Sequence, residues 1–250
     1  MHWLMRMTPR QFIGKLRHRV IPNVQYLRKS RLRRCRCCNR FSAFLQFANA
    51  EEFTVCIRCG ANLRYELLAE YLRERIGAER SLAVWELDPS SALRPLLERA
   101  SIYRRTYYDP AVPREAPRPD GAVMQDVTRT TFADESFDLI VSSDVLEHVP
   151  DLERAFSEMR RVLKRGGACV FTVPTHDATQ RRAALQPDGS VLHLLDPEYH
   201  SDPLNPEGIL AFWNLGFDLQ ECFAAAGLTF RIAKGPEGLS RRIVWEATRA

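Results

Sequence analysis

The sequence predicts an α/β protein with a doubly wound parallel sheet, preceded by a small cysteine-rich module. From about residue 64 onward, short apolar runs alternate with segments of helical periodicity, which is the pattern of parallel strands joined by helices. Before that point, five of the seven cysteines lie between Cys35 and Cys59. A chain of 250 residues with 45% hydrophobic residues is long enough for one full-sized core and a small additional module.

The expected strands are short and apolar, and the expected helices carry apolar residues at spacings of three and four. Strands are expected at 81–87, 101–108, 122–125, 137–142, 168–173, 228–233 and 242–248. Helices are expected around 67–76 and at 90–100, 151–164 and 217–226. The helix at 151–164 has the clearest pattern, and Gly166-Gly167 is expected to close it. The polar stretch 174–206 is too long for an ordinary connection, so we expect a functional insertion or lid there.

Charge is distributed unevenly along the chain. The net charge is +5, yet residues 1–50 hold twelve Arg and Lys and no acidic residue, which leaves residues 51–250 with a net charge of −7. We interpret residues 1–34 as a basic N-terminal arm, in which Phe12, Ile13, Leu16 and Val20 fit one face of a short helix lying on an interface. Such an arm suggests an anionic partner, namely a membrane surface, an anionic glycolipid or nucleic acid. A solvated arm without a specific partner is the alternative.

The compartment is predicted from what the sequence lacks. No apolar run approaches the roughly 18 residues that cross a bilayer. The first residues lack the continuous apolar stretch and cleavage site of a secretory signal. Together with clustered cysteines, these features predict a cytoplasmic protein, with peripheral membrane contact through the arm as an additional hypothesis.

The cysteines have the spacing of a zinc site. Cys35 and Cys38 form one C-x2-C pair, and Cys56 and Cys59 form a second pair after a 17-residue spacer. Two such turns supply four thiolates to a tetrahedral ion, and a site without an open position is structural. We therefore predict a zinc-ribbon-like module over 35–62, with redox chemistry and buried free thiols as the alternatives.

Acidic residues recur where a ligand would bind. Ligands of doubly wound sheets bind at the carboxyl ends of the central strands, and the first four expected strands are followed by Asp88, Asp109, Asp126 and Asp144. Asp109 lies 21 positions after Asp88, close to the spacing at which a nucleotide-binding sheet places a carboxylate on ribose hydroxyls. An acidic neighbourhood of this kind tolerates only a cofactor with an uncharged or cationic tail.

The central motifs resemble a known family. The run from Phe137 to Gly167, FDLIVSSDVLEHVPDLERAFSEMRRVLKRGG, resembles the small-molecule, type 11-like branch of the class I S-adenosylmethionine-dependent methyltransferases. The resemblance covers roughly residues 80–248, and the cysteine module resembles the zinc ribbons that some members carry. It implies a Rossmann-like, mostly parallel, seven-stranded sheet within a domain at 64–250, with S-adenosylmethionine and structural zinc as cofactors.

The resemblance also implies roles for individual residues. Asp126 would hydrogen-bond the adenine amine, Asp109 would bind the ribose, and Glu86 matches the acidic residue of the family's first motif. The expected cofactor-binding residues are Glu86, Leu87, Asp88, Asp109, Asp126, Val127, Ser142 and Ser143. The candidate catalytic residues are His148, at the start of the wall that faces substrate, and His176, directly after the fifth strand.

One departure from the family pattern keeps a second function open. The first motif normally carries glycines, yet no glycine occurs between Gly77 and Gly121, and the corresponding stretch reads Asp-Pro-Ser-Ser-Ala at 88–92. The alternative to an active enzyme is therefore a catalytically degenerate methyltransferase-fold protein that acts by binding or scaffolding.

The acceptor is expected to be a small molecule or glycan that is methylated on a hydroxyl oxygen. The fourth strand ends in Ser-Ser-Asp-Val, which differs from the Asn/Asp-Pro-Pro-aromatic element of enzymes that methylate base amines, and no Pro-Cys nucleophile follows. Both differences count against nucleic acid as the substrate, although a nucleic-acid methyltransferase using the arm and the ribbon stays a further alternative.

Replacing Cys59 with serine tests the zinc assignment. Four thiolates on zinc fold a module with little core of its own, so Cys59→Ser is expected to release the metal and unfold residues 35–62, while the sheet domain survives on its separate core. Zinc content and circular dichroism of the purified variant measure both effects. Retention of stoichiometric zinc would show that the ligand assignment is wrong.

Overall fold

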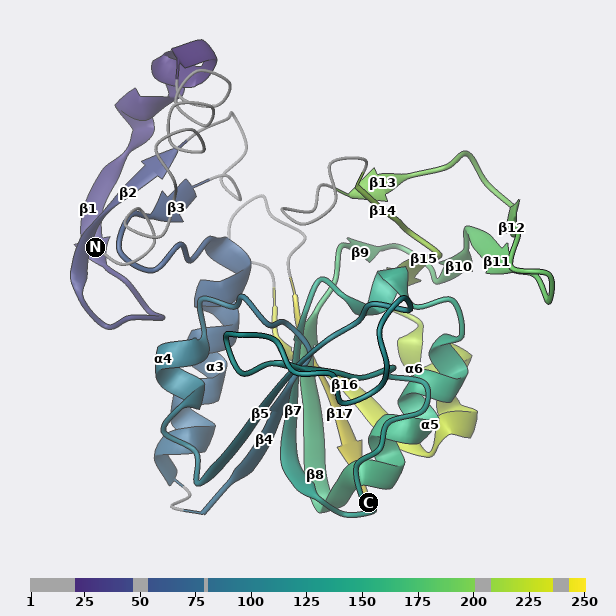
Figure 1. Cartoon of the computed structure of the whole chain (residues 1–250). Helices are drawn as coiled ribbons and strands as arrows, with labels where there is room; N and C mark the ends of the chain where they lie inside the picture. Colours follow the sequence, from purple (N-terminus) through teal and green to yellow (C-terminus); the bar gives the residue numbers. More distant parts are fainter. Residues whose placement is uncertain (1–20, 47–53, 79–80, 201–207, 236–242) are drawn as a thin grey trace. The chain divides into compact units, whose positions relative to one another are not determined.

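The computed structural model describes residues 21–46, 54–78, 81–200, 208–235 and 243–250 (Figure 1). The chain divides into two compact units, residues 1–80 with 90–99 and residues 81–89 with 100–250. No helix in these ranges is long and apolar enough to cross a membrane. The helix expected around Phe12 and Leu16 lies outside the described residues.

The first unit is built on a small antiparallel sheet and the helix that follows it. The sheet consists of β1 (Arg31–Arg34), β2 (Phe41–Gln46) and β3 (Thr54–Cys56), with β2 in the middle. Helix α3 (Leu63–Ala78) and the single turn α4 (Arg94–Leu97) complete the described part of the unit, together with a 3-10 helix at Ile21–Lys29. The domain limits expected at residues 34 and 64 stay predictions, and the contacts group β1 and α3 with the cysteine residues.

A buried carboxylate joins α3 to the sheet. Glu66 is 1% exposed, and its two carboxylate oxygens accept hydrogen bonds from both terminal nitrogens of the Arg33 guanidinium. The backbone N–H of Arg36 donates to the same carboxylate at 3.0 Å. Arg33 also stacks over the Phe44 ring, 3.6 Å from its centroid. A bidentate pair of this kind holds two elements in one orientation.

The second unit contains the predicted doubly wound sheet. Its seven strands lie in the order β16-β17-β8-β7-β4-β5-β6, and only β17 runs against the others. Their bounds are β4 Ala83–Glu86, β5 Ile102–Tyr107, β6 Val123–Met124, β7 Phe137–Ser143, β8 Leu163–Thr172, β16 Leu228–Lys234 and β17 Val244–Arg249. The fold class expected from the sequence is confirmed.

Helix α5 (Leu152–Val162) packs its apolar face against the core of the sheet (Figure 1). Asp151 caps its first turn by accepting a hydrogen bond from the Arg154 N–H at 3.1 Å. Phe156 is fully buried and lies edge-on to the rings of Phe223 and Phe230. The spacing of three and four in the sequence therefore corresponds to one buried face.

Three expected helix bounds were wrong. Helix α5 ends at Val162 because β8 begins at Leu163, so Gly166 lies inside the strand at φ +73° and does not close the helix. The helix expected at 90–100 is reduced to the turn α4, with Pro95 in its first turn. The helix expected at 217–226 divides into α6 (Leu219–Cys222) and a 3-10 turn at Ala224–Ala226, which Gly227 follows.

The long polar stretch after β8 and the segment that follows it form short strands, paired as β10-β15-β9, β11-β12 and β13-β14. Their bounds are β9 Thr175–His176, β10 Gln180–Arg181, β11 Ala183–Leu185, β12 Val191–His193, β13 Tyr199–His200, β14 Ile209–Leu210 and β15 Trp213–Gly216. A Cβ at Gly216 would lie 2.2 Å from the backbone carbon of Ala178, so only glycine permits this close approach. The described part of the stretch is therefore an ordered insertion, and its action as a lid stays a prediction.

A half-buried network of hydrogen bonds fixes the loop that follows β6. Glu158 on α5 accepts hydrogen bonds from the N–H and hydroxyl of Thr130, at 2.7 and 2.8 Å, and from the Arg161 guanidinium. Burial by itself would raise the pKa of Glu158, but the hydrogen bonds from Arg161 and Thr130 outweigh it and hold that pKa below its ordinary value. The loop is thereby tied to a rigid helix.

Replacing Glu158 with glutamine is expected to lower the free energy of unfolding by about 1–2 kcal/mol at pH 7, because the charged hydrogen bonds to Arg161 are lost. A lowered folded-state pKa stabilises above the unfolded value of about 4.3 and loses that effect as the pH falls through the folded value. Urea denaturation of both proteins from pH 7 to pH 3 should therefore show a difference that shrinks on acidification. The exposed Glu153 on the same helix is the control, and Glu153→Gln should change stability by under about 0.5 kcal/mol. A pH-independent difference would contradict the assignment.

Candidate functional site

The register of the sheet brings the expected acidic residues to one edge. Tyr107 of β5 pairs with Met124 of β6, and Asp109 and Asp126 each follow two residues later. Partial burial, and then the charges of Asp126 and Asp109, raise the pKa of Tyr108. The parallel pairing of β5 with β6 therefore places Asp109 and Asp126 at the same edge of the sheet.

Both carboxylates are held by their own loops. Asp109 Oδ1 accepts a hydrogen bond from the Ala111 N–H at 2.9 Å. Asp126 Oδ1 accepts from the N–H and the hydroxyl of Thr128, at 2.9 and 2.7 Å. These Asx turns fix the direction of each carboxylate. Val127, which follows Asp126, packs against the hydrophobic core of the unit.

Glu86 lies deeper than the aspartates. It is 1% exposed at the end of β4, level with Arg105 of β5 and Val141 of β7, and its carboxylate accepts a hydrogen bond from the Tyr103 hydroxyl. Leu87 is also buried, and its N–H donates to the Val141 carbonyl at 3.0 Å. Asp88 is the first half-buried residue after the strand. The polar rim of the sheet at β4 therefore begins at Asp88.

The loop after β4, which contains no glycine, has φ values that residues other than glycine adopt readily. Residues 88–92, all described by the structure, include none of the non-glycine positions with positive φ. The buried Arg105 guanidinium donates to the Pro89 carbonyl at 2.8 Å and to the Asp120 carbonyl. This side chain joins the loop after β4 to the turn before β6. Arg105 was missed from the sequence because nothing in its spacing distinguishes it from the exposed Arg104.

The end of β7 presents two buried serines. Ser142 Oγ is buried and has no hydrogen-bond partner among the described residues, whereas Ser143 Oγ lies 3.3 Å from Thr172 Oγ1. Thr172 in turn donates to Asp144 Oδ1 at 3.0 Å. Asp144 has φ +50°, so the chain turns sharply directly after the strand.

The two candidate catalytic histidines lie in different surroundings. His176 is half-buried on β9, where it pairs with Gly216 of β15. His148 belongs to a short 3-10 helix, Leu146–His148, and its Nδ1 lies 2.9 Å from the Leu210 carbonyl oxygen. The His148 ring is edge-on to that of His200, with centroids 4.9 Å apart. Interaction of the His200 ring with the Glu147 carboxylate is the largest cause that raises the pKa of His200; burial opposes this effect, and Glu198 adds to it.

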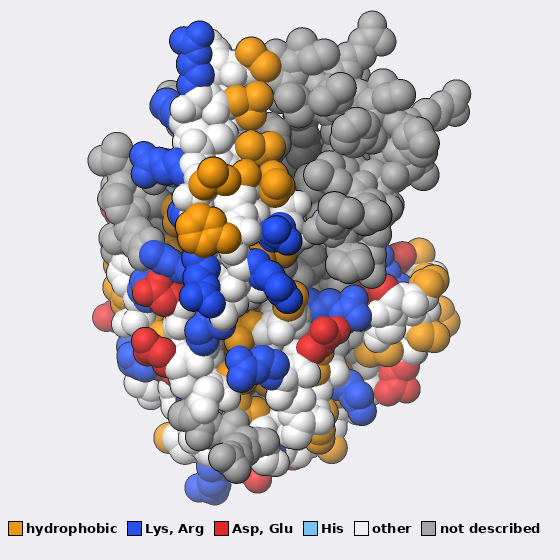
Figure 2. Space-filling model, turned by 90° about the vertical axis from the view of Figure 1, so that its left-hand side faces the viewer, with side chains coloured by type: hydrophobic (Ala, Val, Ile, Leu, Met, Phe, Trp, Pro, Cys, Tyr) orange, Lys and Arg blue, Asp and Glu red, His pale blue; other side chains and the backbone are white. Residues whose placement is uncertain are grey.

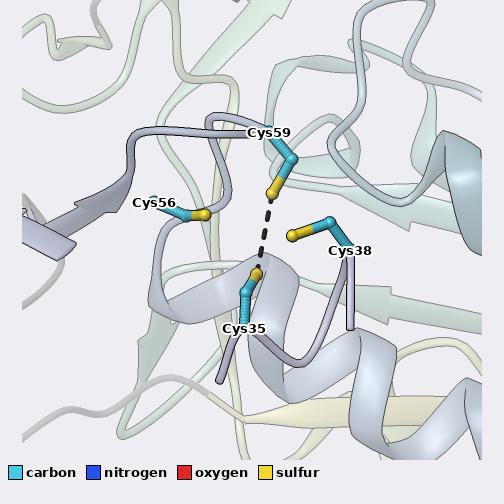
Figure 3. A group of neighbouring side chains, drawn as sticks. All are labelled: Cys35, Cys38, Cys56 and Cys59. Carbon is cyan, nitrogen blue, oxygen red and sulfur yellow. Dashed lines mark hydrogen bonds between the residues drawn. The ribbon is translucent and has the colours of Figure 1, made fainter. Parts of the chain in front are cut away.

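The four predicted zinc ligands converge. The Sγ atoms of Cys35, Cys38, Cys56 and Cys59 all lie within 4.8 Å of one another and point toward one another (Figure 3). The separation of Cys35 and Cys59 is 3.6 Å, and two sulfurs on one tetrahedral zinc are roughly 3.8 Å apart for Zn–S bonds of about 2.3 Å. Cys37 lies outside this group, with its thiol 3.2 Å from the Tyr65 carbonyl oxygen.

The two knuckles share one backbone design. In the first, the Asn39 N–H donates to the Cys35 carbonyl, and in the second the Gly60 N–H donates to the Cys56 carbonyl, both at 2.9 Å. Asn39 and Gly60 have left-handed φ values of 55° and 79°. Glycine at position 60 was recognisable from the sequence, whereas Asn39 was missed, although asparagine is among the few residues that adopt this conformation readily.

Cys222 is exposed on α6, outside the cysteine cluster, so Cys222→Ser is the matched control for Cys59→Ser.

The described part of the basic arm and the first residue of β2 have apolar side chains on their surface. Val24, Leu32 and Phe41 are 58%, 74% and 70% exposed, and the neighbouring Arg31 and Arg34 are also exposed. Figure 2 shows hydrophobic side chains gathered among Lys and Arg side chains on this side of the molecule. A surface of this composition suits an anionic partner with an apolar component.

Comparison with known proteins gives a family match. Residues 59–171 match the family model described as a methyltransferase domain. Dimethylglycine N-methyltransferase of Parasynechococcus marenigrum is 32% identical over 120 residues, which are 48% of this chain and 41% of that protein. Sarcosine/dimethylglycine N-methyltransferase of Halorhodospira halochloris is 38% identical over 63 residues, or 25% of this chain and 23% of that protein. The chain thus spans less than half the length of these curated relatives.

A solved structure is also similar. The 1,6-didemethyltoxoflavin-N1-methyltransferase of Burkholderia thailandensis, solved with 1,6-didemethyltoxoflavin and S-adenosylhomocysteine, has a TM-score of 0.49 and 14% identity, covering 75% of this chain and 79% of that one.

Replacing Arg105 with alanine is expected to lower the free energy of unfolding by about 2–4 kcal/mol, because two charge-assisted hydrogen bonds from a buried group are lost. Arg105→Lys should recover only part of this loss, since an ammonium cannot reproduce the planar fork. Chemical denaturation followed by circular dichroism measures both. The control is Arg104→Ala, at the exposed neighbour on β5, which should cost under about 0.5 kcal/mol. Equal effects at positions 104 and 105 would contradict the role given to Arg105.

Proposed function

The chain carries a class I methyltransferase domain, and from this premise we propose that the protein is an S-adenosylmethionine-dependent methyltransferase that methylates a hydroxyl of a small molecule or glycan. The observation that carries the proposal is the parallel pairing of β5 with β6, which places Asp109 and Asp126 at the same carboxyl edge of the sheet. Both carboxylates are aimed by hydrogen bonds from their own loops. Ligands of doubly wound sheets bind at this edge.

The residues at this edge fit the chemistry of that cofactor. Carboxylates accept hydrogen bonds from ribose hydroxyls and from an exocyclic amine, and they favour a cationic sulfonium electrostatically. Asp109 would hold the ribose and Asp126 the adenine amine. Glu86 is the last residue of β4, and Asp88 lies two residues beyond it. The unpartnered Ser142 hydroxyl would serve the methionine end. When bound, S-adenosylmethionine supplies an already activated methyl group.

The protein's own contribution is then to position the acceptor and to take up a proton. When the neutral His148 ring carries its proton on Nδ1, that N–H donates to the Leu210 carbonyl. The Nε2 atom then has a free lone pair and can accept the hydroxyl proton. His176 on β9 is the second candidate base. In-line positioning supplies most of the rate when the donor is activated in this way.

A small-molecule amine is the second candidate acceptor. The two curated relatives described above, which are named as N-methyltransferases, favour this acceptor. An amine that reacts in its neutral form needs no strong base, so loss of His148 and His176 would affect it less than a hydroxyl acceptor. Identification of the methylated atom in the product by nuclear magnetic resonance separates the two candidates.

We also propose that the Cys35, Cys38, Cys56 and Cys59 cluster holds a structural zinc ion. The spacing of the four sulfurs and the paired left-handed knuckles support this assignment. The apolar and basic surface around Leu32 and Phe41 supports peripheral contact with an anionic membrane or glycolipid more than contact with nucleic acid, because nucleic acid does not require exposed apolar side chains.

Asp126→Asn is the sharpest test of cofactor binding. Asparagine retains the Oδ1 acceptor for Thr128 but presents a donor where the adenine amine needs an acceptor. The charge-assisted hydrogen bond that is lost contributes about 1.5–3 kcal/mol. The Kd for S-adenosylmethionine should therefore rise about 10- to 100-fold. Isothermal titration calorimetry measures this change.

The matched control is Asp188→Asn. Asp188 forms the same Asx turn with Ser190, through an N–H at 2.9 Å and a hydroxyl at 2.7 Å, on an exposed loop. Its replacement should leave the Kd unchanged. If the parent protein gives neither heat nor a thermal shift with S-adenosylmethionine and S-adenosylhomocysteine at millimolar concentration, the enzyme assignment fails and the binding-protein alternative takes its place.

A further inference from the structure

We propose that Glu147, His148 and His200 form a binding site for a divalent transition-metal ion, separate from the cysteine cluster. One ligand atom from each of the three residues lies within 4.8 Å of the other two. Glu147 and His148 come from the 3-10 helix Leu146–His148, and His200 comes from β13 in the insertion after β8. All three belong to the second unit.

The carboxylate of Glu147 lacks a partner that its burial would require. Glu147 is 1% exposed, and neither of its oxygens has a hydrogen-bond partner among the described residues. Its Oε1 lies 3.8 Å from His148 Nε2 and 3.6 Å from His200 Nδ1, both longer than a hydrogen bond. A buried carboxylate without a hydrogen-bond donor at bonding distance is costly, so a cation between Glu147 and the two imidazoles is expected.

The distances suit an ion between the three groups. Two ligands on a tetrahedral zinc, with bonds of about 2.0–2.2 Å, are separated by roughly 3.4 Å. The observed separations of 3.6 and 3.8 Å are slightly larger, so a small inward rotation of the rings would close the site. Three protein ligands leave at least one coordination position open, which distinguishes this cluster from the four-thiolate site.

The outer hydrogen bonds present the correct nitrogens. His148 Nδ1 lies 2.9 Å from the Leu210 carbonyl oxygen, so the proton belongs on Nδ1 and the lone pair on Nε2. His200 Nε2 lies 3.2 Å from Glu198 Oε1, which places the lone pair on Nδ1. In both rings the nitrogen that faces Glu147 is therefore the one able to bind a metal.

The supporting residues are themselves held in place. Glu198 Oε2 forms an ion pair with Arg182 at 3.2 Å, and Arg182 also donates to Asn214 Oδ1 at 3.1 Å. The Phe212 N–H donates to the Glu147 carbonyl at 2.8 Å, which fastens the 3-10 helix to the segment after β14. A carboxylate–histidine–metal arrangement with a fixed outer layer is typical of built metal sites.

The donor set selects the class of ion. Two imidazoles and one carboxylate suit Zn²⁺, Co²⁺ or Fe²⁺ and are a poor match for Ca²⁺ or Mg²⁺, which prefer oxygen ligands. The role of the ion rests on the proposed function: at its open position it would bind the acceptor hydroxyl and lower the pKa of that group. His148 would then act as a ligand, and His176 would be the remaining base.

Metal titration of the full-length protein tests the site without the methyl donor. Zinc is first counted by mass spectrometry in protein washed with a mild chelator, and Zn²⁺ is then titrated by calorimetry. The parent is expected to hold one tightly bound ion and to take up one more per chain. Co²⁺ added to the washed protein should give a visible spectrum without thiolate-to-metal absorption, because no sulfur ligates the second ion.

The variants report on each part of the cluster. Glu147→Gln and His200→Gln should abolish uptake of the second ion while the first remains, and Glu198→Gln should weaken the second Kd about 10- to 100-fold. His193→Gln, at an exposed histidine on β12, is the control and should bind two ions as the parent does. Circular dichroism shows whether each variant is folded, and Glu198→Gln tests the site independently of the buried Glu147.

Three results would overturn the proposal. They are uptake of only one ion by the parent at millimolar Zn²⁺, two-ion binding by folded Glu147→Gln and His200→Gln, and unchanged affinity in Glu198→Gln. The first would indicate that a protonated His200 neutralises Glu147. Because cofactor binding is measured separately, a failed metal titration and a failed S-adenosylmethionine titration are distinguishable.

Discussion

The in-register parallel pairing of β4 with β5 and β7 is the constraint on which the functional edge of the molecule depends. It places Glu86 level with Arg105 on one side and Val141 on the other. The pairing of β5 with β6 then extends the same edge to Asp109 and Asp126. A shift of one residue in any of these pairings would turn the side chains to the opposite face. Side chains on both faces of β4 are buried, so such a shift would also disrupt the packing of the fully buried Trp85 and Ile140.

Buried charge is handled in two ways in this molecule. Glu66 is paired with Arg33, and the Arg105 guanidinium with two carbonyl oxygens. The half-buried Glu158 bonds Thr130 and Arg161. Each of these groups joins two elements that are distant in sequence, and each has hydrogen bonds within the protein. Glu147 is as buried as Glu66, yet among the described residues its oxygens lack donors at hydrogen-bond distance. The contrast is the reason that this carboxylate calls for a cation, whereas the others only fasten the fold.

The features that could be predicted from sequence were those encoded by local spacing. The periodicity of α5, the apolar runs of the central strands and the two C-x2-C pairs each depend on near neighbours, and all three appear in the structure. The end of α5 was misplaced because a strand begins directly after Val162, so that Gly166, typical of a helix end, instead bends β8. Here pairing with β7 overrides the local preference.

The parts of the site that could not be predicted depend on contacts between distant segments. His148 was recognisable from its motif, but its approach to His200 depends on the pairing of β13 with β14 and on the Leu210 carbonyl. Arg105 likewise acts through Pro89 and Asp120, which no periodic pattern relates to it. The insertion after β8 therefore contributes to the site in a way that its polar composition did not reveal.

The distribution of indole rings has an optical consequence. The described tryptophans, Trp85, Trp213 and Trp245, all lie in the second unit, and their ring N–H groups donate to Thr106, Val149 and Thr175. Trp85 and Trp245 are buried, so their fluorescence should lie toward shorter wavelengths and shift to the red when the sheet unfolds. Trp213 lies beside Val149, one residue from His148, and so adds a reporter near the histidine pair. Among the described residues, the cysteine-rich unit contains no such fluorophore, so its unfolding would leave the emission of these three rings in place.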